Sequence, residues 1–211
     1  GHVDLLSESG HHLVELLGNT LDMSKIESGS MEVHSARFQI GRLIETTMGS
    51  LSYMAQENGV RLALHNNLPA PAAYVGDSPK VRQIVYNLLG NAIKFTRYGS
   101  VEIIMSEVDA AESGLATGNS VVQIVVKDEG EGIPADQLET VFEPFSQING
   151  QAARIVPGTG LGLTITKQLV ELLYSTMNDH QRRDYEAELE VDFSYEVPGM
   201  ERFRVNCFHK D

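Results

Sequence analysis

The sequence predicts an α+β fold preceded by a long helix, and three observations lead to this prediction. Apolar residues recur at helical spacing in residues 4–26, 38–57, 78–96 and 161–174. Residues 60–64, 101–108 and 121–127 instead have the alternation, or the Val and Ile content, that is typical of strands. Glycines follow several of the helical segments, where glycine commonly ends a helix.

The first segment, residues 4–26, predicts a helix with an apolar stripe made by Leu6, Leu13, Leu17 and Leu21. A lone helix cannot bury such a stripe in water. The stripe should therefore pack against a second helix, such as one from another copy of the chain, or against the chain's own domain. The sequence leaves these two interpretations open.

The following helices have recognisable ends. Residues 38–57 form an amphipathic pattern that Gly59 should stop. The next helix should begin with Ser78 as its N-cap and Pro79 at its first helical position, and Gly99 should end it. Residues 128–157 contain three glycines and three prolines, which predicts a long loop over a site.

Composition and charge exclude some classes of function. The formal net charge of −13 should repel nucleic acid and anionic lipid, so we expect neither as a partner. Cys207 is the single cysteine, which fits a reducing compartment. No apolar run approaches the roughly 20 residues that cross a bilayer. We expect a cytoplasmic fragment of a longer protein, and the sequence leaves open whether that protein is membrane-anchored.

A polar stripe on the helix over residues 78–96 is the first candidate site. Asn87, Asn91 and Lys94 have the spacing i, i+4, i+7 and so share one face. Amide oxygens suit a hard cation, and an ammonium group suits phosphate. A solvated helix face is the competing interpretation, and for this stripe alone it is favoured.

Two glycine-containing segments offer further candidate residues. Asp128 follows an apolar strand and opens the segment Asp-Glu-Gly-Glu-Gly-Ile-Pro, in which a carboxylate accepts a hydrogen bond beside a flexible backbone. Residues 158–163 read Gly-Thr-Gly-Leu-Gly-Leu before a helix, where free N–H groups attract phosphate. Each is weak alone, because acidic turns and glycine pairs are common.

The order of the segments is more specific than any one of them. Residues 87–96, then Asp-x-Gly-x-Gly, then Phe142-Glu-Pro-Phe145, then Gly-Thr-Gly-Leu-Gly-Leu resemble the N, G1, F and G2 boxes of sensor histidine kinases. The resemblance runs from about residue 9 to 173. It implies a two-layer α/β sandwich of the histidine kinase ATPase type, which holds ATP with Mg²⁺ between a sheet and a mobile lid.

The resemblance also implies roles for single residues. Asn91 would bind Mg²⁺, with Asn87 and Lys94 near the phosphates, and Asp128 would accept a hydrogen bond from the adenine amine. Phe142 and Phe145 would belong to the lid hinge, a role that is compatible with packing in the core. The other residues expected to contact the nucleotide are Gly130, Gly132, Ile133, Gly158, Thr159, Gly160, Leu161, Gly162 and Leu163.

One position separates kinases from hydrolases of this fold. ATP-hydrolysing relatives such as gyrases and mismatch-repair proteins have a Glu where this chain has Asn87, and that Glu activates water as a general base. An amide cannot take up the proton. The resemblance therefore implies a protein-histidine kinase of two-component signalling, with a response regulator receiver domain as partner and a possible homodimer through the N-terminal helix.

The sequence departs from the family at its N-terminal end. His11 and His12 lie in residues 1–30, which resemble the second helix of the dimerisation hairpin, and a His-Glu/Asp-x-Arg/Lys-x-Pro box is absent. We expect both to be surface residues and the phosphoacceptor histidine to come from another chain. A nucleotide-binding or dimerisation module without catalysis is the alternative function.

The C-terminal end departs too. After the catalytic domain predicted over residues 31–172, residues 173–211 resemble the N-terminal domain of type IV pilus twitching-motility ATPases, whose ATPase core is absent. This suggests a chimera, or a fragment that contacts a pilus motor. The tail has a charged helical pattern at 179–188 and strand patterns at 189–197 and 202–208, so we expect it to supply closing strands of the kinase sheet.

Overall fold

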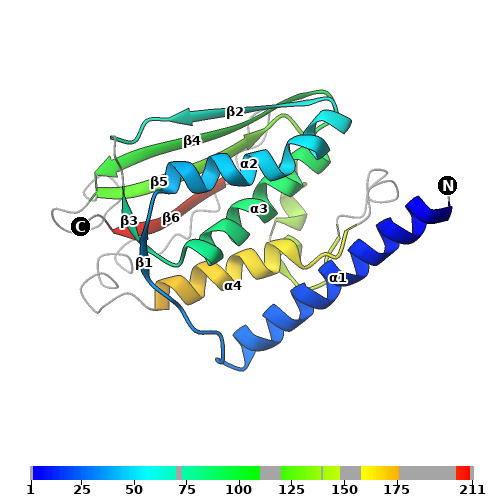
Figure 1. Cartoon of the computed structure of the whole chain (residues 1–211), viewed down its shortest axis with the longest axis horizontal. Coiled ribbons are helices and arrows are strands. Elements are labelled where there is room, and N and C mark those ends of the chain that lie inside the picture. Colours follow the sequence, from blue (N-terminus) through cyan, green and yellow to red (C-terminus); the bar gives the residue numbers. More distant parts are fainter. Residues whose placement is uncertain are drawn as a thin grey trace.

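The computed structural model describes residues 2–69, 73–109, 120–138, 140–147, 158–175 and 203–209 (Figure 1). The helices are α1 (His2–Glu27), α2 (Ile40–Glu57), α3 (Ser78–Phe95) and α4 (Gly162–Ser175), with the short 3-10 helices η1 (Ala135–Gln137) and η2 (Thr140–Phe142). The strands are β1 (Ala36–Phe38), β2 (Val60–Asn66), β3 (Tyr74–Gly76), β4 (Gly99–Asp109), β5 (Ser120–Asp128) and β6 (Phe203–His209). The predicted α+β class is confirmed.

The described strands form one sheet in the order β1-β3-β6-β5-β4-β2. β2 runs parallel to β4, and the other neighbours are antiparallel. Figure 1 shows α2, α3 and α4 along one face of this sheet and α1 beyond α4. This is the predicted two-layer sandwich with a long helix before it.

The core lies between the sheet and α2, α3 and α4. Alternate residues of β4, Val101, Ile103 and Met105, are fully buried, and so are Val122, Ile124 and Val126 of β5 to within 1%, whereas Val125 keeps 9% of its surface exposed. This period of two is what the strand pattern predicts, because successive side chains point to opposite faces. Each fully buried Val, Leu or Ile stabilises the fold by about 1.5–3 kcal/mol.

The two short strands at the sheet edge were not predicted. The helix expected from residue 38 begins at Ile40, because Phe38 belongs to β1, which pairs with β3 through Phe38 and Tyr74. Each of these strands has only three residues. That is too short for an alternating pattern to stand out from a loop.

The ends of α3 differ from the prediction by a residue or more. Asp77, not Ser78, is the N-cap, and its Oδ1 accepts a hydrogen bond from Lys80 N at 3.1 Å. A carboxylate at this position also suits the helix dipole. At the other end the helix stops before Gly99, at a Thr96 C-cap, and Tyr98 has a φ of 58°. Gly59 does follow the end of α2 with a φ of 67°, as predicted.

The apolar stripe of α1 is exposed in the described part of the chain. Leu13, Leu17 and Leu21 keep 57–60% of their surface accessible, so packing of these three residues on their own domain is wrong. At the C-terminal end of α1, Met23 and Ile26 pack against the core. The side chains of His11 and His12 lie outside the described residues.

One strand of the C-terminal tail lies in the sheet. β6 corresponds to the strand predicted at 202–208, and it pairs with β5 at Ile124↔Val205 and with β3 at Val75↔His209. The helix expected at 179–188 and the strand expected at 189–197 lie outside the described residues. The likeness of this tail to pilus ATPases stays a prediction.

Candidate functional site

The polar stripe predicted on α3 is a half-buried face. Val85, Leu89, Ala92 and Ile93 are buried in the core. Asn87, Asn91 and Lys94 are only partly buried, because they lie on the other side of the helix. The packing of α3 therefore fixes the direction in which these polar side chains point.

Asn87 connects α3 to the start of α4. Its Nδ2 donates to Gly162 O at 3.2 Å and approaches Thr166 Oγ1 at 3.4 Å. The Thr166 hydroxyl itself donates to Gly162 O at 2.9 Å. Thr166 is fully buried and was not among the predicted site residues. The one sequence feature that indicated Thr166 is its position one turn after Gly162, the last glycine of the motif, within an otherwise apolar helix.

The Asp128 segment lies against the C-terminal end of α3. Asp128 Oδ1 accepts a hydrogen bond from Gly130 N at 2.8 Å. A Cβ on Gly130 would lie 2.6 Å from that oxygen and 3.0 Å from Phe95 O. Only glycine fits between them, since contacts below 3 Å require something to shift. The turn after β5 and the end of α3 are thus in direct contact.

Burial perturbs the Asp128 carboxyl. Desolvation raises its pKa, and the hydrogen bond from Gly130 N opposes this without cancelling it. A partly desolvated acceptor of this kind is well suited to the N–H groups of a flat heterocycle. The neighbouring Glu129, which was not predicted as functional, accepts a hydrogen bond from Ser100 N at 2.7 Å and so ties the end of β5 to the start of β4.

The Phe142–Phe145 segment contacts the second glycine-containing segment. Phe145 N donates to Gly160 O at 3.0 Å. Gly160 has a φ of 69°, and a Cβ there would lie 2.8 Å from Phe145 C and from Ser146 O. Phe142 is partly buried, but the Phe145 side chain is 63% exposed, so core packing of Phe145 is wrong.

Lys94 reaches the beginning of the same glycine segment. Its Nζ would clash with a Cβ added to Gly158, and it also lies 5.2 Å from the centre of the Phe95 ring. Gln147 Nε2 donates to Gly158 O at 2.6 Å. Thr159 Oγ1 accepts from Leu161 N at 3.2 Å, and Leu161 is fully buried. The Lys94 ammonium therefore lies beside Gly158, which has no side chain that would block a ligand.

These contacts join the predicted segments in pairs: α3 with the glycine segment before α4, α3 with the turn after β5, and residues 145–146 with Gly160. Gly132 has a φ of 74°, and Ile133 and Leu163 are half-buried in the same segments. Asn91 is half-buried one turn of α3 after Asn87. Residues 148–157, between the third and fourth segments, lie outside the described residues.

The donor set fits a nucleotide better than a metal alone. Within the ranges that the structure describes, no three His, Cys, Asp or Glu side chains are grouped closely enough to hold a metal ion. The Asn91 amide is an oxygen ligand of the kind that Mg²⁺ accepts while keeping water and phosphate oxygens. A side chain at Gly130 would instead meet Asp128 Oδ1 and Phe95 O, so this turn depends on glycine. The residues thus fit ATP with Mg²⁺.

Comparison with known proteins agrees with this geometry. Residues 76–203 match the family described as histidine kinase-, DNA gyrase B-, and HSP90-like ATPase. The chain is 37% identical over 171 residues to the autoinducer 2 sensor kinase/phosphatase LuxQ of Vibrio vulnificus (strain YJ016), which covers 81% of this chain and 20% of that protein. It is 36% identical over 173 residues to two-component system protein A of Emericella nidulans, covering 82% and 25% respectively.

Solved structures have the same fold. Full-length ShkA in complex with AMPPNP matches with a TM-score of 0.74 and 26% identity, over 100% of this chain and 39% of that chain. The Acinetobacter baumannii histidine kinase AdeS matches with a TM-score of 0.70 and 18% identity, over 99% and 84%, and shows the fold alone. The chain spans a fifth to a quarter of the curated relatives named above. Among the described helices, none has the length and apolar character to cross a membrane.

Proposed function

The chain belongs to the family of histidine kinase-, DNA gyrase B- and HSP90-like ATPases, and we propose that it is the ATP-binding catalytic part of a sensor histidine kinase. It would transfer the γ-phosphoryl group of ATP to a histidine on another chain. The observation that carries this proposal is the set of direct contacts that join α3, the turn after β5 and the segment before α4. The relatives named as sensor kinases and the AMPPNP complex of ShkA support it.

Each site residue has a task that follows from its position. Asp128 accepts a hydrogen bond from the adenine amine, and the base lies against the backbone at Gly130 and Gly132. Lys94 and the N–H groups at the start of α4 bind the phosphate chain. The Asn91 amide holds Mg²⁺, which neutralises phosphate charge when bound. Catalysis then depends on positioning and charge rather than on a covalent intermediate.

Asn87 supports transfer over hydrolysis. Its amide donates to Gly162 O and cannot remove a proton from water. A chain with this residue keeps ATP intact until an acceptor histidine reaches the γ-phosphoryl group. The further partners that we propose are a response regulator receiver domain and a second copy of the chain bound through α1, whose Leu13, Val14, Leu17 and Leu21 are 57–70% exposed. A cytoplasmic location would suit both partners.

The first experiment is a calorimetric titration with ATP, with and without Mg²⁺. We expect N91A to lose on the order of tenfold in affinity when Mg²⁺ is present, the effect of removing one contact to a charged group. The two proteins should bind alike when Mg²⁺ is chelated, because the lost contact is to the metal. The matched control is N67A, an exposed amide side chain directly after β2.

The second experiment measures transfer. Radiolabelled ATP is incubated with the chain and a separately supplied dimerisation domain that carries an acceptor histidine. We expect acid-labile label on the added domain and little free phosphate. Rapid release of phosphate without labelling would identify a hydrolase, and ATP binding with neither product would identify a non-catalytic nucleotide-binding module. In the titration, an ATP affinity of N91A that matches the unaltered chain in the presence of Mg²⁺ would refute Asn91 as the metal ligand.

A further inference from the structure

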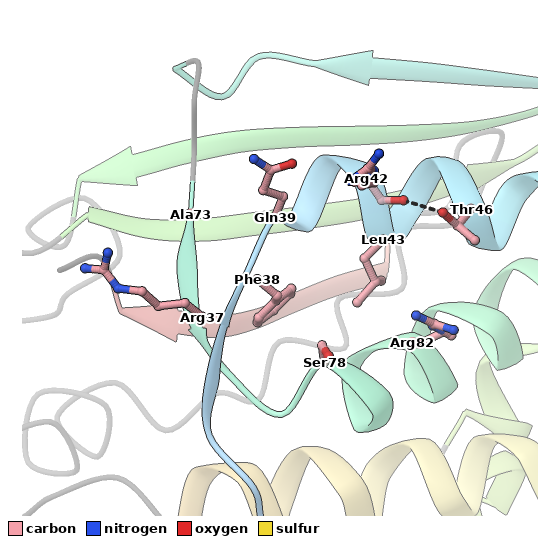
Figure 2. A pocket seen from close by; sticks show the side chains of 9 residues that line it. All are labelled: Arg37, Phe38, Gln39, Arg42, Leu43, Thr46, Ala73, Ser78 and Arg82. Atoms are coloured by element: carbon pink, nitrogen blue, oxygen red, sulfur yellow. Dashed lines mark hydrogen bonds between the residues drawn. The ribbon is translucent and has the colours of Figure 1, made fainter.

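A second hollow, of about 450 Å³, lies beside the first turns of α2 and α3 (Figure 2). Ser78, the first residue of α3, lines it, whereas Lys94 of the nucleotide site is 16 residues further along the same helix, roughly 24 Å at about 1.5 Å per residue. None of the residues that line it belongs to the nucleotide site. It is therefore a separate feature of the molecule.

The lining of this hollow is cationic in an acidic protein. Arg37 of β1, Arg42 of α2 and Arg82 of α3 line it, and no Asp or Glu is among its lining residues. The chain as a whole carries a formal charge of −13, so the composition does not account for three arginines here. The buried Asp77 nearby is held by Lys80 Nζ at 2.8 Å and by His34 N at 2.9 Å, so its charge is already matched.

The helices explain how these side chains come together. Arg42 and Leu43 lie in the first turn of α2, and Ser78 and Arg82 are spaced i, i+4 at the start of α3, which contacts α2. Figure 2 shows Leu43 between Arg42 and Arg82, with the Phe38 ring beside Ser78. Arg37 extends the other way along the strands.

The hollow thus combines charge with an apolar wall. Arg42 and Arg82 lie on either side of Leu43, and Phe38 lines the same hollow. Guanidinium groups bind phosphate oxygens through paired hydrogen bonds. Gln39, the N-cap of α2, makes no side-chain capping hydrogen bond, and the N–H groups at the start of a helix favour an anion. Small-molecule sites begin at about 300 Å³, and this volume exceeds that.

We propose that this hollow binds a small organic phosphate, with the phosphate group between Arg42 and Arg82 and the apolar body on Phe38 and Leu43. A free molecule is favoured over a lipid headgroup, because the net charge of −13 opposes approach to an anionic membrane surface. The site is independent of the nucleotide site and of the activity proposed for it.

The test titrates phenyl phosphate into the full chain while AMPPNP and Mg²⁺ saturate the nucleotide site. We expect binding that R42Q and R82Q each weaken by roughly tenfold, as for the loss of a charge-assisted hydrogen bond. R61Q removes the same charge from an exposed position on β2 and should bind as the unaltered chain does. Inorganic phosphate should bind more weakly, and benzyl alcohol should not bind. Circular dichroism checks that the variants fold.

Several results would overturn the proposal. Undiminished binding in both R42Q and R82Q would remove the arginines from the site, and displacement of phenyl phosphate by AMPPNP would assign it to the nucleotide site. Co-sedimentation with vesicles that contain phosphatidic acid, lost in R82Q, would replace the small molecule with a lipid headgroup. Titrating ATP with Mg²⁺ into R82Q and N91A in the absence of AMPPNP separates failure of this site from failure of the proposed nucleotide site.

Discussion

Substitution of Gly160 by alanine tests the contact between the Phe145 segment and the glycine segment. Gly160 has a φ of 69°, and a Cβ there would meet Phe145 C and Ser146 O at 2.8 Å and Phe145 Cα at 2.9 Å. All of these atoms are backbone, so no flexible side chain can move aside. The neighbouring backbone must therefore shift, and the hydrogen bond from Phe145 N to Gly160 O must lengthen or break.

The magnitude follows from two costs. A residue with a Cβ in the left-handed region costs about 1–2 kcal/mol, and forcing an extra methyl group into packed structure costs about 1–3 kcal/mol. The sum, about 2–5 kcal/mol, is an upper limit, because the segment can detach locally instead of unfolding the domain. If about 2 kcal/mol reaches the global transition, the melting temperature of a chain of this size falls by roughly 4–8 °C.

The assay combines thermal unfolding with an ATP titration. G160A should lower the melting temperature, weaken ATP binding, or do both, depending on whether the segment detaches. The matched control is G49A, since Gly49 lies in α2 with nothing within 4 Å of an added Cβ. That change should stabilise the chain by roughly 0.5–1 kcal/mol through helix propensity. An unchanged melting temperature together with unchanged ATP affinity in G160A would refute the contact.

Three further predictions concern charge and association. Burial raises the pKa of the Asp128 carboxyl, so protonation of this group favours the folded state. This stabilisation is complete below the ordinary pKa of 3.8 and is lost as pH rises through the raised value. D128N should therefore have a higher melting temperature than the unaltered chain at pH 7, but it should bind ATP on the order of tenfold more weakly. Equal melting temperatures of D128N and the unaltered chain at pH 7 would contradict this. Burial alone would raise the pKa of Asp77, but hydrogen bonds from Lys80 and from His34 N outweigh it and lower the pKa. D77A should therefore cost about 2 kcal/mol in urea unfolding at pH 7, with the cost shrinking as pH falls below 3.8, whereas D136A at an exposed position should be neutral. Finally, L17E places a charge on the exposed stripe of α1, and analytical ultracentrifugation should show loss of the proposed dimer; a dimer that survives L17E would exclude this stripe.

The amino-acid sequence alone predicted which residues of α3, β4 and β5 are buried, but it did not decide whether the apolar stripe of α1 is covered. The apolar positions of residues 78–96 predicted the buried face of α3, and the half-buried face with Asn87, Asn91 and Lys94 follows from the same period. Long strands such as β4 and β5 were predictable for the same reason, because eight or more residues give a clear pattern. The Asp-x-Gly-x-Gly and Gly-x-Gly-x-Gly segments also identified the site candidates from sequence order.

Only the tertiary structure decided which elements meet. Nothing in the local pattern states that Gly130 lies against Phe95 or that Gly160 lies against residues 145–146. The tail was expected to supply strands of the sheet, but the place of β6 between β3 and β5 was not predicted. The three arginines of the second hollow come from three different elements and share no sequence motif. The physical reason is that periodicity encodes which face of an element avoids water, whereas the partner that covers that face is selected by packing between residues far apart in the chain.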